Sequence, residues 1–115
     1  MSDRRVSLPT VTLDEISENV RELSAAHGWD QADPTVRMLH LSSEIGEVAD
    51  ALLTLRDAQP DTTDEARTAL GHEIFDAIWN LCALADATGI DLEQAARSKM
   101  IMNAARTWSR DDRRP

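Results

Sequence analysis

The chain has 115 residues, of which 42% are hydrophobic and 29% are charged, and its formal net charge is −9. This length predicts a single domain with a small core, which association with further copies would help to stabilise. The negative charge argues against binding to nucleic-acid polymers, because contacts with phosphate backbones need clustered Lys and Arg. No apolar run reaches the ~20 residues of a membrane span, and residues 1–10 contain no apolar signal segment, so we expect a soluble, cytoplasmic protein without a membrane partner.

The single cysteine, Cys82, excludes an internal disulfide and any cysteine-based zinc site. Proteins without disulfides are typical of reducing compartments, which agrees with a cytoplasmic location. The simplest interpretation of Cys82 is a small apolar residue that packs in the core.

The first predicted helix follows a flexible polar arm, residues 1–11. Thr12 and Glu15 have the spacing of a capping box, and the helix ends before Gly28. Apolar residues recur with helical spacing between these limits, at Leu13, Ile16, Val20 and Leu23.

Two long helices are expected next. Asp33 is a helix cap followed by Pro34 at the first helical position, and the helical pattern continues to about Arg56. A third helix begins near Thr63 and ends at Gly89, a residue type common just after helix ends. This helix is apolar nearly all round, which indicates a second buried surface and therefore a dimer or a larger oligomer.

A last helix is expected to begin after Asp91, which forms a second capping box with Gln94, and to run to about Trp108. Residues 109–115 form a flexible charged tail. With no strand pattern in the chain, we predict an all-α four-helix bundle over residues 12–108 that assembles as a dimer or tetramer.

Two pairs of acids stand out on the long helices. Glu44 and Glu47 are three residues apart on one helix, and Glu73 and Asp76 have the same spacing on the next. No Lys or Arg occurs between positions 38 and 55 or between positions 68 and 96. The chain therefore offers no basic residue nearby in sequence to neutralise these carboxylates.

Helical periodicity places the acids beside the apolar faces. At about 100° per residue, Glu73 and Asp76 lie on an arc of small apolar residues. On the earlier helix the acids border an apolar stripe, whose centre we expect at Leu41, Ile45 and Leu52. A solvated face is the usual meaning of one Glu-x-x-Glu motif, but two such motifs without basic partners favour another interpretation.

A cluster of partly buried carboxylates is costly, because burial and mutual repulsion both disfavour the ionised form. A divalent cation would offset this cost. Oxygen ligands select Mg²⁺, Mn²⁺ or Ca²⁺ over zinc. The sequence therefore predicts a site for one of these three cations at Glu44, Glu47, Glu73 and Asp76.

The last helix carries polar residues suited to phosphate. Lys99, Asn103 and Arg106 are spaced by four and three residues and share one face. Ammonium, amide and guanidinium groups all donate hydrogen bonds to phosphate oxygens. The alternative is that the two cations favour the helix C-terminus or form surface ion pairs.

Four further residues are candidates for contact with a base. Trp29 and Trp79 offer flat surfaces for stacking, and His40 and Asn80 lie on the acid-bearing faces of their helices. A tryptophan is more often a core residue than a binding platform, and His40 also fits a hydrogen-bonded structural role.

The acid motifs Glu44-Ile-Gly-Glu47 and Glu73-Ile-Phe-Asp76, with Lys99-Met-Ile-Met-Asn103-Ala-Ala-Arg106, resemble the MazG-type all-α nucleoside triphosphate pyrophosphohydrolases. The segment Gly28-Trp29-Asp-Gln is similar to the subgroup that includes dCTP pyrophosphatases. The resemblance covers roughly residues 13–108.

The resemblance implies Mg²⁺-dependent hydrolysis of a nucleoside triphosphate, such as dCTP or a modified deoxynucleotide, to monophosphate and pyrophosphate by a dimer or tetramer. It assigns the four acids to metal, the Lys99 face to phosphate and Trp29 to the base. Among the acids, Glu44 and Glu47 are the catalytic candidates, and we prefer Glu47 as general base because it lies further from the apolar centre. Trp79 and Asn80 depart from the usual family residues, which leaves the choice of base open.

The sequence also suggests two other classes of protein. One is a non-catalytic helical dimerisation module whose acids bind a structural cation or a basic partner. The other is a carboxylate-bridged di-iron protein, which needs Glu-x-x-His pairs. No Glu in the chain has a His three residues later, which argues against the di-iron protein.

Overall fold

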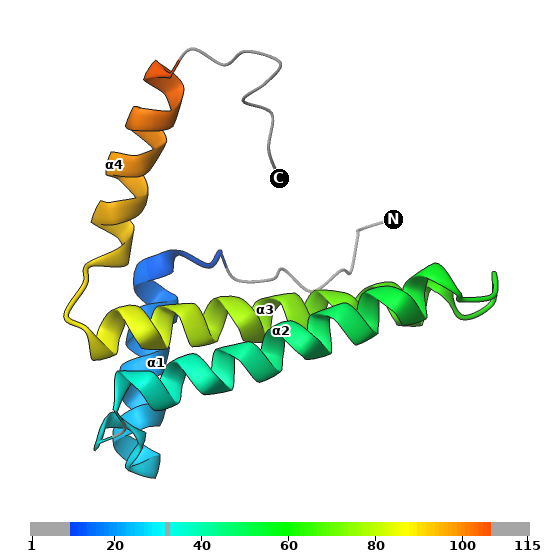
Figure 1. Ribbon diagram of the computed structural model, residues 1–115, viewed down its shortest axis with the longest axis horizontal. Coiled ribbons are helices and arrows are strands. Elements are labelled where there is room, and N and C mark those ends of the chain that lie inside the picture. Colours follow the sequence, from blue (N-terminus) through cyan, green and yellow to red (C-terminus); the bar gives the residue numbers. More distant parts are fainter. Residues whose placement is uncertain (1–9, 32, 107–115) are drawn as a thin grey trace, which may run out of the picture.

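The computed structural model describes residues 10–31 and 33–106, which form four α-helices and one short 3₁₀ helix (Figure 1). The α-helices are α1 (Leu13–His27), α2 (Pro34–Arg56), α3 (Thr63–Ala87) and α4 (Leu92–Ala105), and the 3₁₀ helix η1 is Trp29–Gln31. This confirms the all-α fold with four main helices. Much of the predicted arm and all of the predicted tail lie outside the described residues, so the domain limits at 12 and 108 stay predictions.

Helix α1 is fixed at both ends by the residues that the sequence indicated. The Thr12 hydroxyl accepts a hydrogen bond from the Glu15 backbone N–H at 3.2 Å and donates one to the Glu15 carboxylate at 3.1 Å. At the other end Gly28 has φ 74°, and its N–H donates to the Ser24 carbonyl. Glycine adopts this left-handed conformation readily, because it has no Cβ atom to clash with the backbone. The chain therefore turns sharply at Gly28 into η1.

Helices α2 and α3 form a long antiparallel hairpin, seen as the horizontal arm of Figure 1. Asp33 caps α2 by accepting from the Thr35 N–H at 2.8 Å, and Pro34 occupies the first turn. The turn between the helices is closed by the Thr62 N–H, which donates to the Gln59 carbonyl at 2.9 Å. The hairpin is therefore set by a local cap at the start of α2 and by a closed turn at the start of α3.

The end of α3 redirects the chain. Gly89 has φ 72°, its N–H donates to the Asp86 carbonyl, and the Ile90 N–H donates to the Ala85 carbonyl at 2.9 Å. This pair of bonds is the Schellman arrangement that ends helices. Asp91 then caps α4 by accepting from the Gln94 N–H at 3.1 Å.

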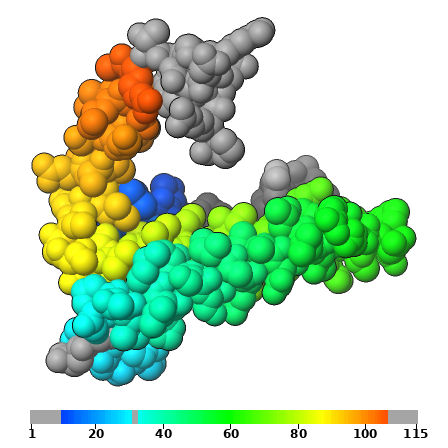
Figure 2. All heavy atoms as spheres, in the orientation of Figure 1, coloured from blue at the N-terminus to red at the C-terminus, as the bar shows by residue number. Residues whose placement is uncertain are grey.

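Helix α4 leaves the other helices rather than lying along them (Figure 1; Figure 2). Its main contacts are with α1, and none of its residues is buried. The helix ends at Ala105, with Arg106 extended, so the predicted end near Trp108 was three residues too late, and Trp108 lies outside the described residues.

The core lies where α1 crosses α3. Its centre is formed by Val20, Cys82 and Ala83, each at most 1% exposed. Partly buried apolar side chains surround it: Leu13, Ile16, Trp79 and Leu92. The expectation that Cys82 packs in the core is confirmed, and it is a free thiol.

Much apolar surface remains exposed on the single chain. On α4, Met100 and Ile101 are each 71% exposed, and on α3 Ile74 and Phe75 are exposed by more than 40%. Among the described helices, none combines the length and the apolarity that crossing a bilayer requires.

The inner face of α2 differs from the predicted one. Leu41 is buried as expected, but Ile45 and Leu52 are 52% and 54% exposed. The side that meets α3 instead carries Arg37, Leu41 and Glu44. The predicted apolar centre was therefore wrong by a rotation of the helix, and Glu44 lies on the packed face rather than at its border.

Candidate metal and nucleotide site

Three glutamates from the middle of the hairpin converge. Glu44 and Glu47 are one turn apart on α2, and Glu73 faces them from α3. One carboxylate oxygen from each lies within 4.8 Å of the other two. Because α2 and α3 form an antiparallel hairpin, Glu73 of the second predicted acid pair lies beside the first pair.

The carboxylates lack the partners that buried acids normally have. Oε2 of Glu44 and Oε2 of Glu73 are buried without a hydrogen-bond donor. Among residues 10–31 and 33–106, no ion pair involves the four predicted acids. An unsatisfied buried carboxylate oxygen costs free energy unless a donor or a cation approaches it.

This crowding perturbs the acids. Desolvation raises the pKa of Glu44, and the negative charges of Glu47, Asp76 and Glu73 raise it further. The pKa of Glu73 is also raised, chiefly by side-chain hydrogen bonding with Glu47 and then by burial. The nearby His72 lowers the pKa of Glu73 by a smaller amount. Both acids are thus held in surroundings that disfavour their ionised form.

Asp76 has a different position from the other three acids. Its side chain is exposed and does not belong to the group that converges within 4.8 Å. It is close enough for its charge to raise the pKa of both Glu44 and Glu73. Asp76 therefore lies at the rim of the cluster.

The donor set suits a hard divalent cation. It contains only carboxylate oxygens, two of which have no other partner, on two packed helices. Mg²⁺ and Mn²⁺ favour such ligands, and a cation there would neutralise the repulsion that raises the two pKa values. Glu44, Glu47 and Glu73 are the residues that would hold it.

A pocket lies beside the acids, toward the start of α2 and the end of α3. It encloses about 260 Å³, below the ~300–1,000 Å³ typical of sites for drug-sized ligands. Its size suits a ring system rather than a whole nucleotide. The lining contains all four predicted base-side residues and two others: Trp29, Val36, Arg37, His40, Trp79 and Asn80.

The two tryptophans of the pocket are held in place. Their rings meet edge to face with centroids 6.3 Å apart, and His27 stacks on Trp29 at 4.6 Å. The Trp79 indole N–H donates to the Asn19 side chain at 3.0 Å. Trp79 therefore contributes both to the core and to the pocket wall.

Helical spacing sets the distance between the pocket and the acids. Asn80 follows Asp76 by one turn and donates from its side-chain amide to the Asp76 carbonyl at 2.8 Å. His40 precedes Glu44 by the same interval. Four residues span about 6 Å of helix, so the acids and the pocket form neighbouring parts of one surface.

Arg37 is a site residue that the sequence analysis missed. Its side chain is buried, with 8% exposed, and it lines the pocket. Nη2 donates to the Ser24 hydroxyl at 3.1 Å and to the Trp29 carbonyl at 3.0 Å. The available signal was its position seven residues before Glu44, two helical turns away on the same face.

The predicted phosphate-side residues are not brought to the acids by a single chain. Lys99, Asn103 and Arg106 belong to α4 and its cap, and α4 extends away from the hairpin (Figure 1). Lys99 and Arg106 are exposed, and Asn103 is partly buried.

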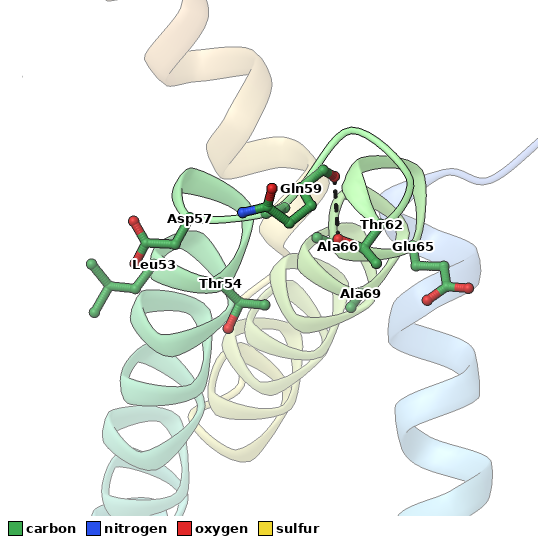
Figure 3. Close-up of a pocket in the computed structure, with 9 residues that line it drawn as sticks. Leu53, Thr54, Asp57, Gln59, Thr62, Glu65, Ala66 and Ala69 are labelled. Atoms are coloured by element: carbon green, nitrogen blue, oxygen red, sulfur yellow. Dashed lines mark hydrogen bonds between the residues drawn. The ribbon is translucent and has the colours of Figure 1, made fainter.

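A second hollow lies at the far tip of the hairpin, away from these residues (Figure 3). It is lined by residues such as Leu53, Gln59 and Ala69 and encloses about 660 Å³. One of its two acids, Asp57, is already paired with Arg56 at 3.0 Å. This hollow therefore lacks a convergent set of chemical groups.

Comparison with known proteins gives relatives over most of the chain. It is 34% identical to dCTP pyrophosphatase 1 of Rattus norvegicus and 33% identical to that of Homo sapiens, each over 102 residues and 85% of the chain. An uncharacterised protein of Bacillus subtilis, YvdC, is 28% identical over 85 residues, which cover 69% of this chain and 80% of YvdC.

The chain spans about 60% of the length of the two mammalian relatives. No family model matches the sequence. The similarity to the mammalian proteins includes the helices that carry the acids and the pocket, since it extends over 85% of the chain. Together with the four-helix all-α fold, these relatives support the assignment of the chain to the MazG-like family, which the acid motifs of the sequence resemble.

Proposed function

We propose that the protein hydrolyses a nucleoside triphosphate, with a deoxynucleotide as substrate, to the monophosphate and pyrophosphate. The observation that carries the proposal is the convergence of Glu44, Glu47 and Glu73 one turn away from an aromatic pocket. The name of the mammalian relatives, dCTP pyrophosphatase 1, makes dCTP the first substrate to test.

The acids account for the first requirement of the reaction. A triphosphate is strongly anionic, and carboxylates repel it unless cations intervene. Glu44 and Glu73, with their buried unpaired oxygens, would hold Mg²⁺, with Mn²⁺ as a substitute. When bound, Mg²⁺ supplies charge neutralisation and Lewis-acid polarisation of the phosphate.

Glu47 is the proposed general base. It is exposed, whereas Glu44 and Glu73 are partly buried, so a water molecule can reach it. Glu47 would take a proton from the water that attacks the α-phosphorus. The bond from that phosphorus to the bridging oxygen then breaks, and pyrophosphate leaves.

The pocket would hold the base. Trp29 and Trp79 present apolar ring surface, which favours stacking, and His40 and Asn80 add polar groups at the wall. With the base there, the phosphates extend about one helical turn toward the acids. Asp76 at the rim would contribute to the metal site as the substrate enters.

Lys99, Asn103 and Arg106 of one copy of the chain would bind phosphate oxygens of a substrate that lies at the acids of a second copy. Support comes from the exposed apolar side chains on α3 and α4, which indicate a dimer or tetramer. In such an assembly α4 of one copy would reach the acids of another. The free, buried Cys82 and the nucleotide substrate favour action in the cytoplasm.

The shared site has a direct test. Glu44→Gln and Lys99→Ala are each expected to be inactive alone. In dimers formed by co-expression, half of the molecules are mixed, and each mixed dimer has one intact site. Mixing is therefore expected to restore about one quarter of wild-type activity if the sites combine two chains symmetrically. Absence of any recovery would count against a shared site.

The activity itself is tested with a panel of canonical and modified ribo- and deoxynucleoside triphosphates. Mg²⁺-dependent release of pyrophosphate is expected for at least one of them, with Glu44→Gln and Glu73→Gln inactive and Glu18→Gln on α1 as an active control. Release of orthophosphate would mean that a different bond is cleaved. No turnover with any nucleotide would favour a non-catalytic helical module that binds a cation.

A further inference from the structure

The base pocket contains a buried cation whose hydrogen-bonding capacity is mostly unused. Arg37 lies at the pocket wall with 8% of its surface exposed. A guanidinium has five N–H donors. In the described part of the chain only the two on Nη2 are used, for the Ser24 hydroxyl and the Trp29 carbonyl.

The three remaining donors are on Nε and Nη1. Nε is buried without a partner. Nη1 makes no hydrogen bond within residues 10–31 and 33–106, and it belongs to a side chain that lines the pocket. The partners of Nη2 are both neutral, and no carboxylate within the described residues forms an ion pair with Arg37.

A buried guanidinium without a carboxylate is expensive, because its charge is only partly compensated by neutral acceptors. The two contacts of Nη2 fix its orientation by tying α2 to α1 and to η1. The remaining donors are therefore preorganised, and acceptor atoms of a ligand in the pocket would complete their hydrogen bonding.

We propose that Arg37 is a specificity-determining residue, which selects a nucleobase edge that presents a hydrogen-bond acceptor, a ring carbonyl or ring nitrogen, to Nη1. This rests on the proposed function, since it takes the pocket as the base site. Arg37 is buried, and buried donors discriminate strongly between ligands, because an analogue that lacks the acceptor leaves the donor unpaired.

The experiment uses nucleosides without phosphate and without metal, so that only the pocket is tested. The probes are matched pairs that differ in one acceptor: deoxycytidine and 2-thiodeoxycytidine, thymidine and its 2-thio and 4-thio forms, deoxyguanosine and 7-deazadeoxyguanosine. Binding is followed by the indole N–H signals of Trp29 and Trp79 in ¹⁵N spectra. The wild-type chain is expected to bind at least one parent nucleoside roughly tenfold more tightly than its analogue.

Arg37→Met is expected to remove that difference, to less than about twofold, because Met fills similar volume without donors. Arg67→Met is the matched control, since Arg67 is an exposed helical arginine paired with Asp64. Should Arg37→Met lose its helical circular dichroism, Ser24→Ala replaces it. That variant removes one of the two contacts that orient the guanidinium, and the discrimination is expected to shrink.

The inference is overturned if the wild-type chain distinguishes no pair, or if Arg37→Met keeps the wild-type discrimination. Failure of the proposed reaction gives a different pattern. Nucleoside discrimination that depends on Arg37, without pyrophosphate release from any triphosphate, would overturn the hydrolysis and leave the role of Arg37 standing. If pyrophosphate is released but Arg37→Met keeps the wild-type selectivity, the hydrolysis stands and the role of Arg37 is overturned.

Discussion

Replacing Glu44 by Gln is expected to stabilise the metal-free protein at pH 7. Oε2 of Glu44 is buried without a donor, and one carboxylate oxygen from each of Glu44, Glu47 and Glu73 lies within 4.8 Å of the other two. The substitution keeps the shape of the side chain and removes its negative charge. It therefore relieves repulsion across the α2–α3 contact without creating a cavity.

The expected size of the effect follows from the geometry. Two unit charges 4.8 Å apart repel by ~3.5 kcal/mol at an effective dielectric constant of 20. Glu47 is exposed, so water and salt reduce this repulsion strongly. We expect a gain of about 1 kcal/mol in the free energy of unfolding, or a rise in Tm of about 4 °C.

The pH dependence provides the specific signature. The pKa of Glu44 is raised in the folded state, so the folded protein binds more protons than the unfolded chain as pH rises from the ordinary glutamate pKa of about 4.3. The stability that Glu44 contributes to the wild-type protein is therefore fully present below that pH, and it is lost as the pH rises through the folded pKa. The advantage of Glu44→Gln should appear over that range and vanish below it.

Urea denaturation followed by circular dichroism, at one protein concentration and in EDTA, measures the effect. Adding Mg²⁺ should reverse the order, because the wild-type chain gains about 1.4 kcal/mol at ten times its Kd and the variant gains less. Glu18→Gln on α1 is the control and should behave as wild type. A loss of stability in Glu44→Gln at pH 7, or a gain that is the same at every pH, would refute the reasoning.

Three further predictions concern the core, a helix end and the pocket. Val20→Ala, beside Cys82 in the core, should lower the free energy of unfolding by roughly 2 kcal/mol in urea denaturation, because it removes two buried methyl groups. Gly89→Ala should lower the free energy of unfolding by about 1 kcal/mol in the same measurement, because a residue with a Cβ is strained at a φ of 72°. No larger loss is expected, since no atom would clash with the new Cβ. Trp29→Ala should raise KM for the preferred triphosphate about tenfold or more with little change in kcat, since it removes a stacking surface beside Trp79; an unchanged KM would exclude Trp29 from base binding.

The helix limits were predictable because they depend on local chemistry. Thr12, Asp33 and Asp91 each accept a hydrogen bond from a backbone N–H in the first turn of the helix that follows. Gly28 and Gly89 take the left-handed conformation that ends a helix. Such signals act within a few residues and need no knowledge of the tertiary packing.

The inner face of α2 was not predictable in the same way. Apolar residues mark surfaces that avoid water, but the pattern does not say which partner covers them. Ile45 and Leu52 are more than half exposed in one chain, whereas Glu44 faces α3. Apolar residues on two sides of a helix merge into one broad arc in the sequence pattern, and the mean direction of that arc lies between the two sides.

Arg37 illustrates a second limit. Arg37 lies immediately before the stretch without cations, and nothing in its sequence neighbourhood marks it as buried. Only the folded chain reveals that this residue turns inward to Ser24 and the Trp29 carbonyl. Charged residues are rarely buried, so sequence reasoning assigns them to the surface by default.

The position of the acids links stability to the proposed activity. Glu44 and Glu73 occupy the packed side of the α2–α3 hairpin, where apolar side chains of similar size would stabilise the fold. The chain instead keeps mutually repelling groups there, and their cost is relieved when a cation binds. Any cation that the cluster holds therefore also tightens the hairpin, because binding to the folded state alone adds to its stability. Since the wall of the pocket is built on the same two helices, through His40 on α2 and Trp79 on α3, the order of the pocket should depend on whether the acids are neutralised.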